Sequence, residues 1–133
     1  MEIPQGIHHV EINVHQLERS KEFYSWLLQE LGFAIYQEWD KGISYKKGTA
    51  YLVFTQTNEK YINNSFHRKH TGLNHLALWA QSRAQINQLR VQLTNRNVSF
   101  LYEEKYPFAG GSDHYALFFE DPDRIKIEIV AAR

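Results

Sequence analysis

The hydrophobic pattern of the chain occurs twice. The strand-like run from Gly6 to Ile12 matches the run from Gly72 to Leu78 position by position, which aligns His9 with His75 at an offset of 75 − 9 = 66 residues. Self-similarity at a fixed spacing indicates a repeated structural unit. The chain is therefore expected to contain two copies of one module.

Each strand-like run is followed by a helical pattern. Apolar residues recur at steps of three and four, as they do on one face of an α-helix. They are Phe23, Trp26, Leu27 and Leu31 in the first copy and Ile86, Leu89 and Leu93 in the second. Gly32 and Asn97 follow at an offset of 65, and both residue types readily take the left-handed conformation that ends helices.

Three further strand-like runs complete each copy. Their residues are 33–39, 43–47 and 50–55 in the first copy, and 98–103, 114–119 and 125–130 in the second. Both copies thus predict the order βαβββ. The predicted fold class is α+β, as one domain of 133 residues with modules at 5–56 and 72–131.

Two polar segments interrupt the modules. Residues 57–71 lack a sustained period and form the predicted linker, with His-Arg-Lys-His at 67–70. This cationic run is either a solvated part of the linker or a segment that reaches over a site to meet an anionic substrate. Residues 106–113 contain Pro107, Gly110 and Gly111 and are predicted to form a flexible loop.

Composition narrows the functional classes. Lys and Arg together number 15 and balance 15 Asp and Glu, so no basic excess favours nucleic acid or a membrane surface. The N-terminus has no signal-peptide pattern, and no apolar run is long enough to span a bilayer. We expect a soluble, cytoplasmic protein. Cysteine is absent, so a metal ion would have to be held by histidine, carboxylate or water.

Alternation along the strands separates two faces. Residues two apart share a face, so His9, Glu11 and Asn13 should point away from the apolar face that carries Val10, Ile12 and Val14. His8 falls on the apolar side of this alternation. In the last strand, Glu128 lies with Lys126 and Val130, opposite three isoleucines.

Four separated motifs carry a family resemblance. IHHVEINV, LERSKEFYSWLLQELGF, GLNHLALWA and FFEDPDRIKIEIV occur in an order that resembles the vicinal oxygen chelate superfamily. That superfamily includes glyoxalase I, fosfomycin-resistance proteins, extradiol dioxygenases and bleomycin-binding proteins. The resemblance implies sheets that curl into an open cavity, with His9, His75 and Glu128 as metal ligands.

The resemblance also has two departures. Glyoxalase-type enzymes take a fourth ligand from the last strand of the first module, and aligning the short strands places Val53 there, at an offset of 128 − 53 = 75 from Glu128. Valine neither ligates metal nor accepts a proton, so Glu11, His8 and His114 become the candidate catalytic bases. Arg124 stands where the family turn usually has glycine, which implies a strained or re-formed turn.

Several functions remain open under this resemblance. One is a lyase, isomerase or thiol transferase that uses a divalent ion, Mn, Fe, Ni or Zn, on a small oxygen-chelating molecule. Another is a non-haem Fe(II) dioxygenase, since two histidines and a carboxylate suit that ion. A third is a non-catalytic bleomycin-resistance-type binding protein. The expected assembly is a homodimer. The expected cavity residues are Asn13, Trp39, Tyr51, Val53, Trp79 and Phe118.

Overall fold

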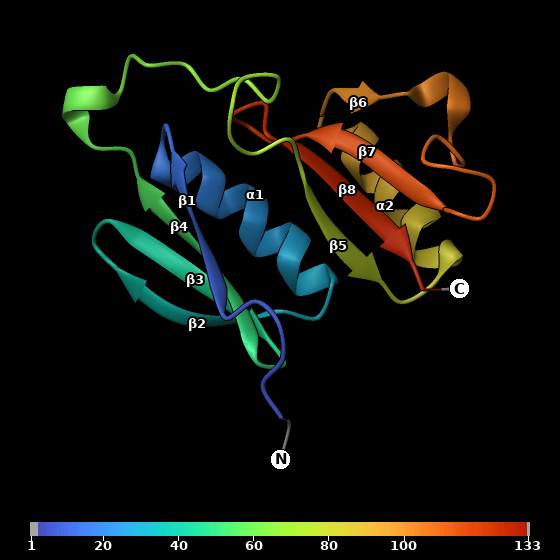
Figure 1. The fold of residues 1–133 in the computed structure, drawn as a ribbon, viewed down its shortest axis with the longest axis horizontal. Helices are drawn as coiled ribbons and strands as arrows, with labels where there is room; N and C mark the ends of the chain where they lie inside the picture. The colour runs from blue at the N-terminus through green and yellow to red at the C-terminus, as the bar shows by residue number, and fades with distance from the viewer. Residues whose placement is uncertain (1–2, 133) are drawn as a thin grey trace. The chain divides into compact units, whose positions relative to one another are not determined.

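The computed structural model describes residues 3–132, and the chain divides into two compact units between Ser65 and Phe66. Each unit contains one helix and one four-stranded sheet (Figure 1). The order of elements is βαβββ in both, so the α+β prediction with two tandem modules is confirmed. The division falls inside the predicted linker.

The two sheets have the same topology. The first module comprises β1 (His9–Val14), α1 (Leu17–Glu30), β2 (Ala34–Trp39), β3 (Gly42–Lys47) and β4 (Ala50–Gln56), with sheet order β1-β4-β3-β2. The second comprises β5 (Leu76–Ala80), α2 (Arg83–Asn95), β6 (Phe100–Leu101), β7 (Ala116–Glu120) and β8 (Lys126–Ala131), with order β5-β8-β7-β6. In each sheet the first and last strands pair in parallel and the other pairs are antiparallel.

The second strand of the second module is shorter than predicted. The run 98–103 forms only the two-residue strand β6, because Tyr102 adopts a left-handed backbone (φ 58°, ψ 34°) and a 3-10 helix follows, η2 (Glu103–Lys105). A second 3-10 helix, η1 (Glu59–Tyr61), lies within the linker. Left-handed backbone cannot continue a strand, which ends the pairing with β7.

Both helices end in the same way. Gly32 (φ 93°) and Asn97 (φ 61°) take the left-handed conformation directly after the last turn. The N–H of Phe33 donates to the carbonyl of Leu28, and the N–H of Val98 donates to that of Leu93. These are Schellman-type bonds, which satisfy carbonyls that the helix leaves free. The two stop signals read from the sequence are confirmed.

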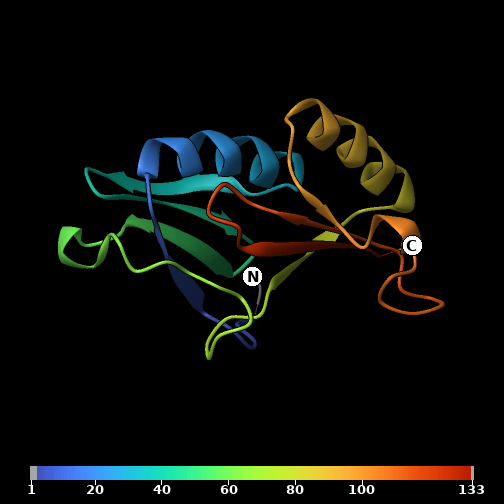
Figure 2. The same cartoon turned by 90° about the horizontal axis from the view of Figure 1, so that it is seen from above.

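Each helix covers one face of its own sheet (Figure 2). In the first module Tyr24 of α1 stacks on Phe54 of β4 at 4.1 Å between ring centroids, and both side chains are fully buried. In the second, the helical stripe predicted from the sequence is buried where α2 packs on β8, whose isoleucines are buried as well. Full burial of one such side chain contributes about 1.5–3 kcal/mol, so these faces hold each module together.

The turn before β8 has the conformation expected from Arg124, whose φ is 65°. The Oδ1 atom of Asp121 accepts hydrogen bonds from the backbone N–H groups of Asp123 (2.7 Å) and Ile125 (2.8 Å). The Arg124 N–H donates to the Asp121 carbonyl at 2.9 Å. Asp121 therefore stabilises a turn that lacks the usual glycine.

The cationic run of the linker is partly engaged within the second module. Arg68 donates to Glu120 at 2.7 Å, and the side chains of this ion pair are only 19% and 10% exposed. The guanidinium of Arg68 thus neutralises a carboxylate of the fold, which removes it from the cations that could meet a substrate.

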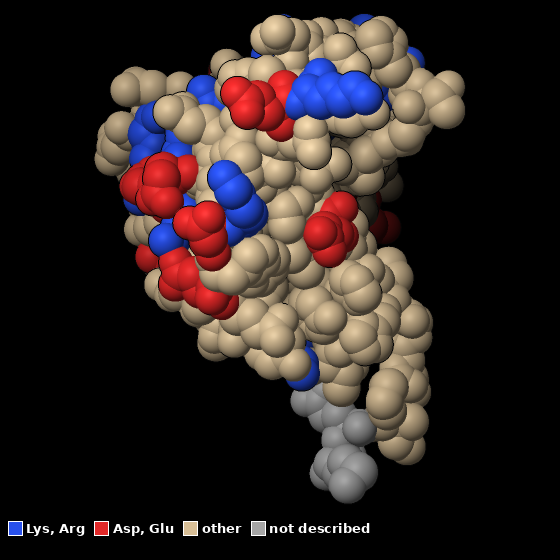
Figure 3. Space-filling model, turned by 90° about the vertical axis from the view of Figure 1, so that its left-hand side faces the viewer, with Lys and Arg blue, Asp and Glu red and all other residues tan. Residues whose placement is uncertain are grey.

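The one face of the molecule drawn in the space-filling view agrees with the balanced composition. Acidic and basic side chains are intermixed on the face drawn in Figure 3. Among the described residues, no helix combines the length and apolar character needed to cross a membrane.

Candidate functional site

The site predicted in the second module lies on the sheet face that α2 does not cover. Glu128 occupies the middle of this face, because β8 runs between β5 and β7. Its ladder neighbours are Ala77 and Phe118. His75 directly precedes β5, so its side chain continues the same face, as predicted.

Two imidazoles converge on the Glu128 carboxylate, which is only 5% exposed. His75 Nε2 lies 2.9 Å from Oε1, and His114 Nε2 makes a short contact with Oε2. His114 was predicted only as a candidate base, and the structure brings it to the predicted metal ligands. A solvated surface role for Glu128 is excluded by its burial.

The orientation of His75 is set by Asn74, a residue that sequence reasoning missed. The Nδ1 atom of His75 lies 2.7 Å from Asn74 Oδ1. The other ring nitrogen, Nε2, lies 2.9 Å from Glu128 Oε1. Both nitrogens of the imidazole thus have a polar side-chain partner, and the two contacts together fix the orientation of the ring.

Gly110 makes room for His114. A Cβ atom added at Gly110 would lie 2.5 Å from Cδ2 of the His114 ring, closer than real Cβ contacts come. The loop predicted at 106–113 therefore positions a site residue through one of its glycines. The spacing of glycines in the sequence carries no signal for this contact, since it depends on the path of the loop.

The site opens into a cavity of about 420 Å³. It combines a buried carboxylate, two imidazoles, two ammonium groups and two aromatic rings. Its lining residues are His75, Tyr102, Lys105, Ala109, Gly110, His114, Phe118, Lys126 and Glu128. Phe118 was predicted to line a cavity, whereas Tyr102, Lys105 and Lys126 were not. Trp79, also predicted there, lies on the same sheet face with 66% of its surface exposed.

The equivalent face of the first module has different chemistry. His9 stacks on Tyr51 with centroids 4.8 Å apart, and its Nδ1 atom lies 2.8 Å from Nδ1 of His8. His8 precedes β1 and is exposed, so it does not join the apolar face on which the alternation placed it. Glu11 is exposed on the same face as His9.

The ladder registers identify the position equivalent to Glu128. Glu11, two residues after His9, pairs with Val53, and Ala77, two residues after His75, pairs with Glu128. Val53 therefore occupies the matching place, as the sequence alignment predicted, and it is buried. The first module has no carboxylate at this position.

Two other predicted cavity residues of the first module have local partners. Asn13 Oδ1 accepts a hydrogen bond from Thr55 at 3.1 Å. Trp39 covers Gly42 across the β2–β3 hairpin, since a Cβ at Gly42 would lie 2.4 Å from the indole. Among residues 3–132, no group of three or more His, Cys, Asp or Glu side chains has the arrangement of a preformed metal site.

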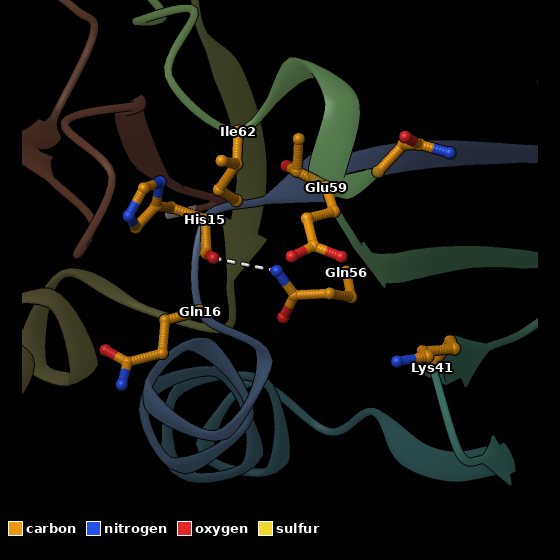
Figure 4. Close-up of a pocket in the computed structure, with 8 residues that line it drawn as sticks. His15, Gln16, Lys41, Gln56, Glu59 and Ile62 are labelled. Carbon is orange, nitrogen blue, oxygen red and sulfur yellow. Dashed lines mark hydrogen bonds between the residues drawn. The ribbon is translucent and has the colours of Figure 1, made fainter.

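A second hollow lies in the first module, with a volume of about 580 Å³ (Figure 4). Gln56 is central to it: its Oε1 accepts the N–H of Leu17 at the start of α1, and its Nε2 donates to the His15 carbonyl. Gln56 thus caps a helix whose N-cap residue, Gln16, makes no side-chain cap of its own. This hollow marks a structural junction between β4 and α1.

Comparison with known proteins identifies the family to which this chain is similar and one relative in sequence. A model of the glyoxalase/bleomycin resistance protein/dioxygenase superfamily matches residues 6–129. The chain is 49% identical over 125 residues to the uncharacterized protein YqjT of Bacillus subtilis (strain 168). The aligned residues make up 94% of this chain and 98% of that protein.

Solved structures agree with the fold. A Bacillus halodurans protein, provisionally described as a glyoxalase, superposes with a TM-score of 0.91 at 56% identity over 94% of each chain. Lactoylglutathione lyase from Agrobacterium tumefaciens superposes with a TM-score of 0.67 at 17% identity, over 98% of this chain and 96% of that one. The second likeness concerns the fold alone.

Proposed function

Because the chain belongs to the glyoxalase/bleomycin resistance protein/dioxygenase superfamily, we propose that it is a metal-dependent enzyme acting on a small molecule with neighbouring oxygens. The reaction class is that of a lyase, an isomerase or a thiol transferase. The convergence of His75 Nε2, 2.9 Å from Oε1, and of His114 Nε2 on the buried Glu128 carboxylate carries the proposal, because imidazole nitrogens and carboxylate oxygens are the ligands that such divalent ions take in proteins.

The ligand set combines His75 and Glu128 of the second module with His9, the equivalent residue of the first. The family resemblance supplies His9, from this chain or from the partner in a homodimer. Two imidazoles and one carboxylate suit Mn, Fe, Ni or Zn. When bound, such an ion polarises vicinal oxygens of a substrate and stabilises the negative charge that develops on them.

The residues around these ligands prepare the site. Asn74 contacts Nδ1 of His75 and orients the ring so that Nε2 faces Glu128. His114 contacts Oε2 of Glu128 and leaves Oε1 directed at His75. His114 is thus a positioning residue for the carboxylate.

The base that moves substrate protons is proposed to be Glu11. It is the direct ladder partner of Val53, the position from which glyoxalase-type enzymes of the family supply a carboxylate. Partners in a parallel ladder present neighbouring side chains on one face. Glu11 therefore lies on the strand next to the position where this chain has Val53 in place of that carboxylate. Its carboxylate is exposed, so a substrate can reach it.

The test is the metal content of the purified protein, measured by plasma mass spectrometry. Wild type and the variants His75→Ala, Glu128→Ala and His70→Ala are dialysed together, the last as a control in the linker. We expect about one ion per chain in wild type and control, and loss in both site variants. No uptake from added Mn, Fe, Ni or Zn would contradict the proposal and favour a ligand-sequestering protein.

A dioxygenase is the alternative within the same ligand set. His75, Glu128 and His9 would then hold Fe(II), which would supply oxygen chemistry on a catechol-type substrate. Oxygen consumption by the Fe(II)-loaded protein with catechol separates this reaction from lyase or transferase chemistry, neither of which consumes oxygen.

A further inference from the structure

The cavity of the second module contains an ammonium group that the proposed metal site does not use. Lys126 Nζ donates a hydrogen bond to the Tyr102 hydroxyl at 2.8 Å. It also lies over two aromatic rings, 4.8 Å from the centroid of Tyr102 and 5.4 Å from that of Phe118. These contacts hold the charge in one place at the cavity wall.

The positive charge of Lys126 is available to a ligand because the neighbouring carboxylates have other partners. Glu120, which pairs with Lys126 across the β7–β8 ladder, is engaged by Arg68 and by Arg124. Both oxygens of Glu128 are in contact with imidazoles. A negatively charged ligand group can therefore approach Lys126 without displacing an ion pair.

Tyr102 adds a directed donor to the same place. Its hydroxyl accepts the Lys126 proton, so its own hydrogen remains for a ligand oxygen. The ring lies edge-on to Phe118, 5.3 Å between centroids, and the backbone of Tyr102 is left-handed. An aromatic residue rarely adopts this conformation, and such backbone outliers concentrate at binding sites.

We propose that this cavity binds the anionic group of the substrate, a carboxylate or a phosphonate, through Lys126 Nζ and Tyr102 OH, with Lys105 at its edge. The assignment of this group to a substrate rests on the proposed function. Lys126 and Glu128 are two residues apart on β8 and share a face. The substrate is thereby a small acid whose charged group binds beside its chelating oxygens.

The test uses the full chain after metal removal, so that it is independent of the metal site. Benzoate, phenylphosphonate and neutral benzyl alcohol are titrated while amide signals are followed by NMR. We expect the two anions to shift residues of the cavity and benzyl alcohol to leave them unchanged. Added salt should weaken the anion binding, because the contact is electrostatic.

Variants assign the binding to the proposed groups. Lys126→Met keeps the length of the side chain and removes its charge, and it should weaken anion binding about tenfold or more. Tyr102→Phe keeps the ring, removes the donor and should weaken binding as well. Lys60→Met is the matched control, since Lys60 also lies over a tyrosine ring, that of Tyr61 at 5.7 Å, and does not line the cavity.

The anion that binds more tightly identifies the group as carboxylate or phosphonate, and comparable binding of both supports their shared oxyanion chemistry. Equal binding of benzyl alcohol overturns the proposal, as does unchanged anion affinity in Lys126→Met. Failure here with normal metal uptake leaves the proposed function standing. Anion binding without metal uptake would support the anion site and contradict the metal-dependent function.

Discussion

The contact between Gly110 and His114 leads to a prediction with a distinctive sign. In Gly110→Ala, the new Cβ would lie 2.5 Å from His114 Cδ2, so the ring must retreat by about 0.9 Å to reach the 3.4 Å of ordinary contact. Such a movement lengthens and weakens the contact between His114 and Glu128. The buried carboxylate then depends mainly on His75.

The magnitude follows from two opposing effects. Losing a hydrogen bond to a buried charged group costs about 1–3 kcal/mol, and the His114 side chain is 40% exposed, which favours the lower half of that range. The backbone of Gly110 is outside the left-handed region, so alanine is compatible there and contributes roughly 0.4–1 kcal/mol by restricting the unfolded chain. Because the ring movement weakens this bond without removing it, the net expected cost of Gly110→Ala is at most about 1 kcal/mol.

The effect of Gly110→Ala on stability should change sign when His114 is absent. In the His114→Ala background the clash has no partner, so Gly110→Ala should leave stability unchanged or raise it by up to about 1 kcal/mol. Urea unfolding of the wild type, both single variants and the double variant measures this coupling as a double-mutant cycle. An equal cost of Gly110→Ala in both backgrounds would refute the reasoning.

Two further predictions concern the second module. Replacing Arg68 with methionine should lower the free energy of unfolding by about 2 kcal/mol in urea, because Glu120 is 10% exposed and loses its closest cation. Lys21→Met, which removes an exposed ion pair, should change little, and the two variants behaving alike would contradict this reasoning. Burial and then the neighbouring Tyr115 hydroxyl, which shares the acceptor Asn87 Oδ1, raise the pKa of Tyr106 to about 12. This raised pKa stabilises the fold below pH 10, and the stabilisation is lost as the pH rises to about 12, so Tyr106→Phe should show a flatter alkaline stability profile by denaturant unfolding. Ultraviolet titration of the wild type and of Tyr106→Phe isolates the ionisation of Tyr106 as a difference. Ionisation of Tyr106 at pH 10 would contradict the raised pKa.

The module architecture was predictable because its signals are local. Strand alternation and helical spacing depend on residues a few positions apart, and Gly32 and Asn97 report a backbone conformation directly. The equivalence of Val53 and Glu128 could also be aligned, since two short strands with the same neighbours admit few registers. The ladder pairs confirm that alignment.

The details of the cavity could not be read in the same way. The left-handed backbone of Tyr102 shortened a predicted strand, and aromatic residues give no signal for that conformation. The contact of Gly110 with His114, and that of Lys126 with Tyr102, depend on loop paths that bring separate segments together. Asn74 was adjacent to a predicted ligand, but only its side-chain direction reveals that it orients the ring.

The parallel pairing of the first and last strands has a consequence for how each module tolerates substitutions. Each module pairs its strands within its own sheet and fills its own core, so a substitution in one module leaves the backbone hydrogen bonding of the other intact. The two copies can then specialise, as Val53 and Glu128 illustrate at one equivalent position. A repeated module thus allows the side chains of one half to change while the other half keeps its own, without loss of the shared architecture.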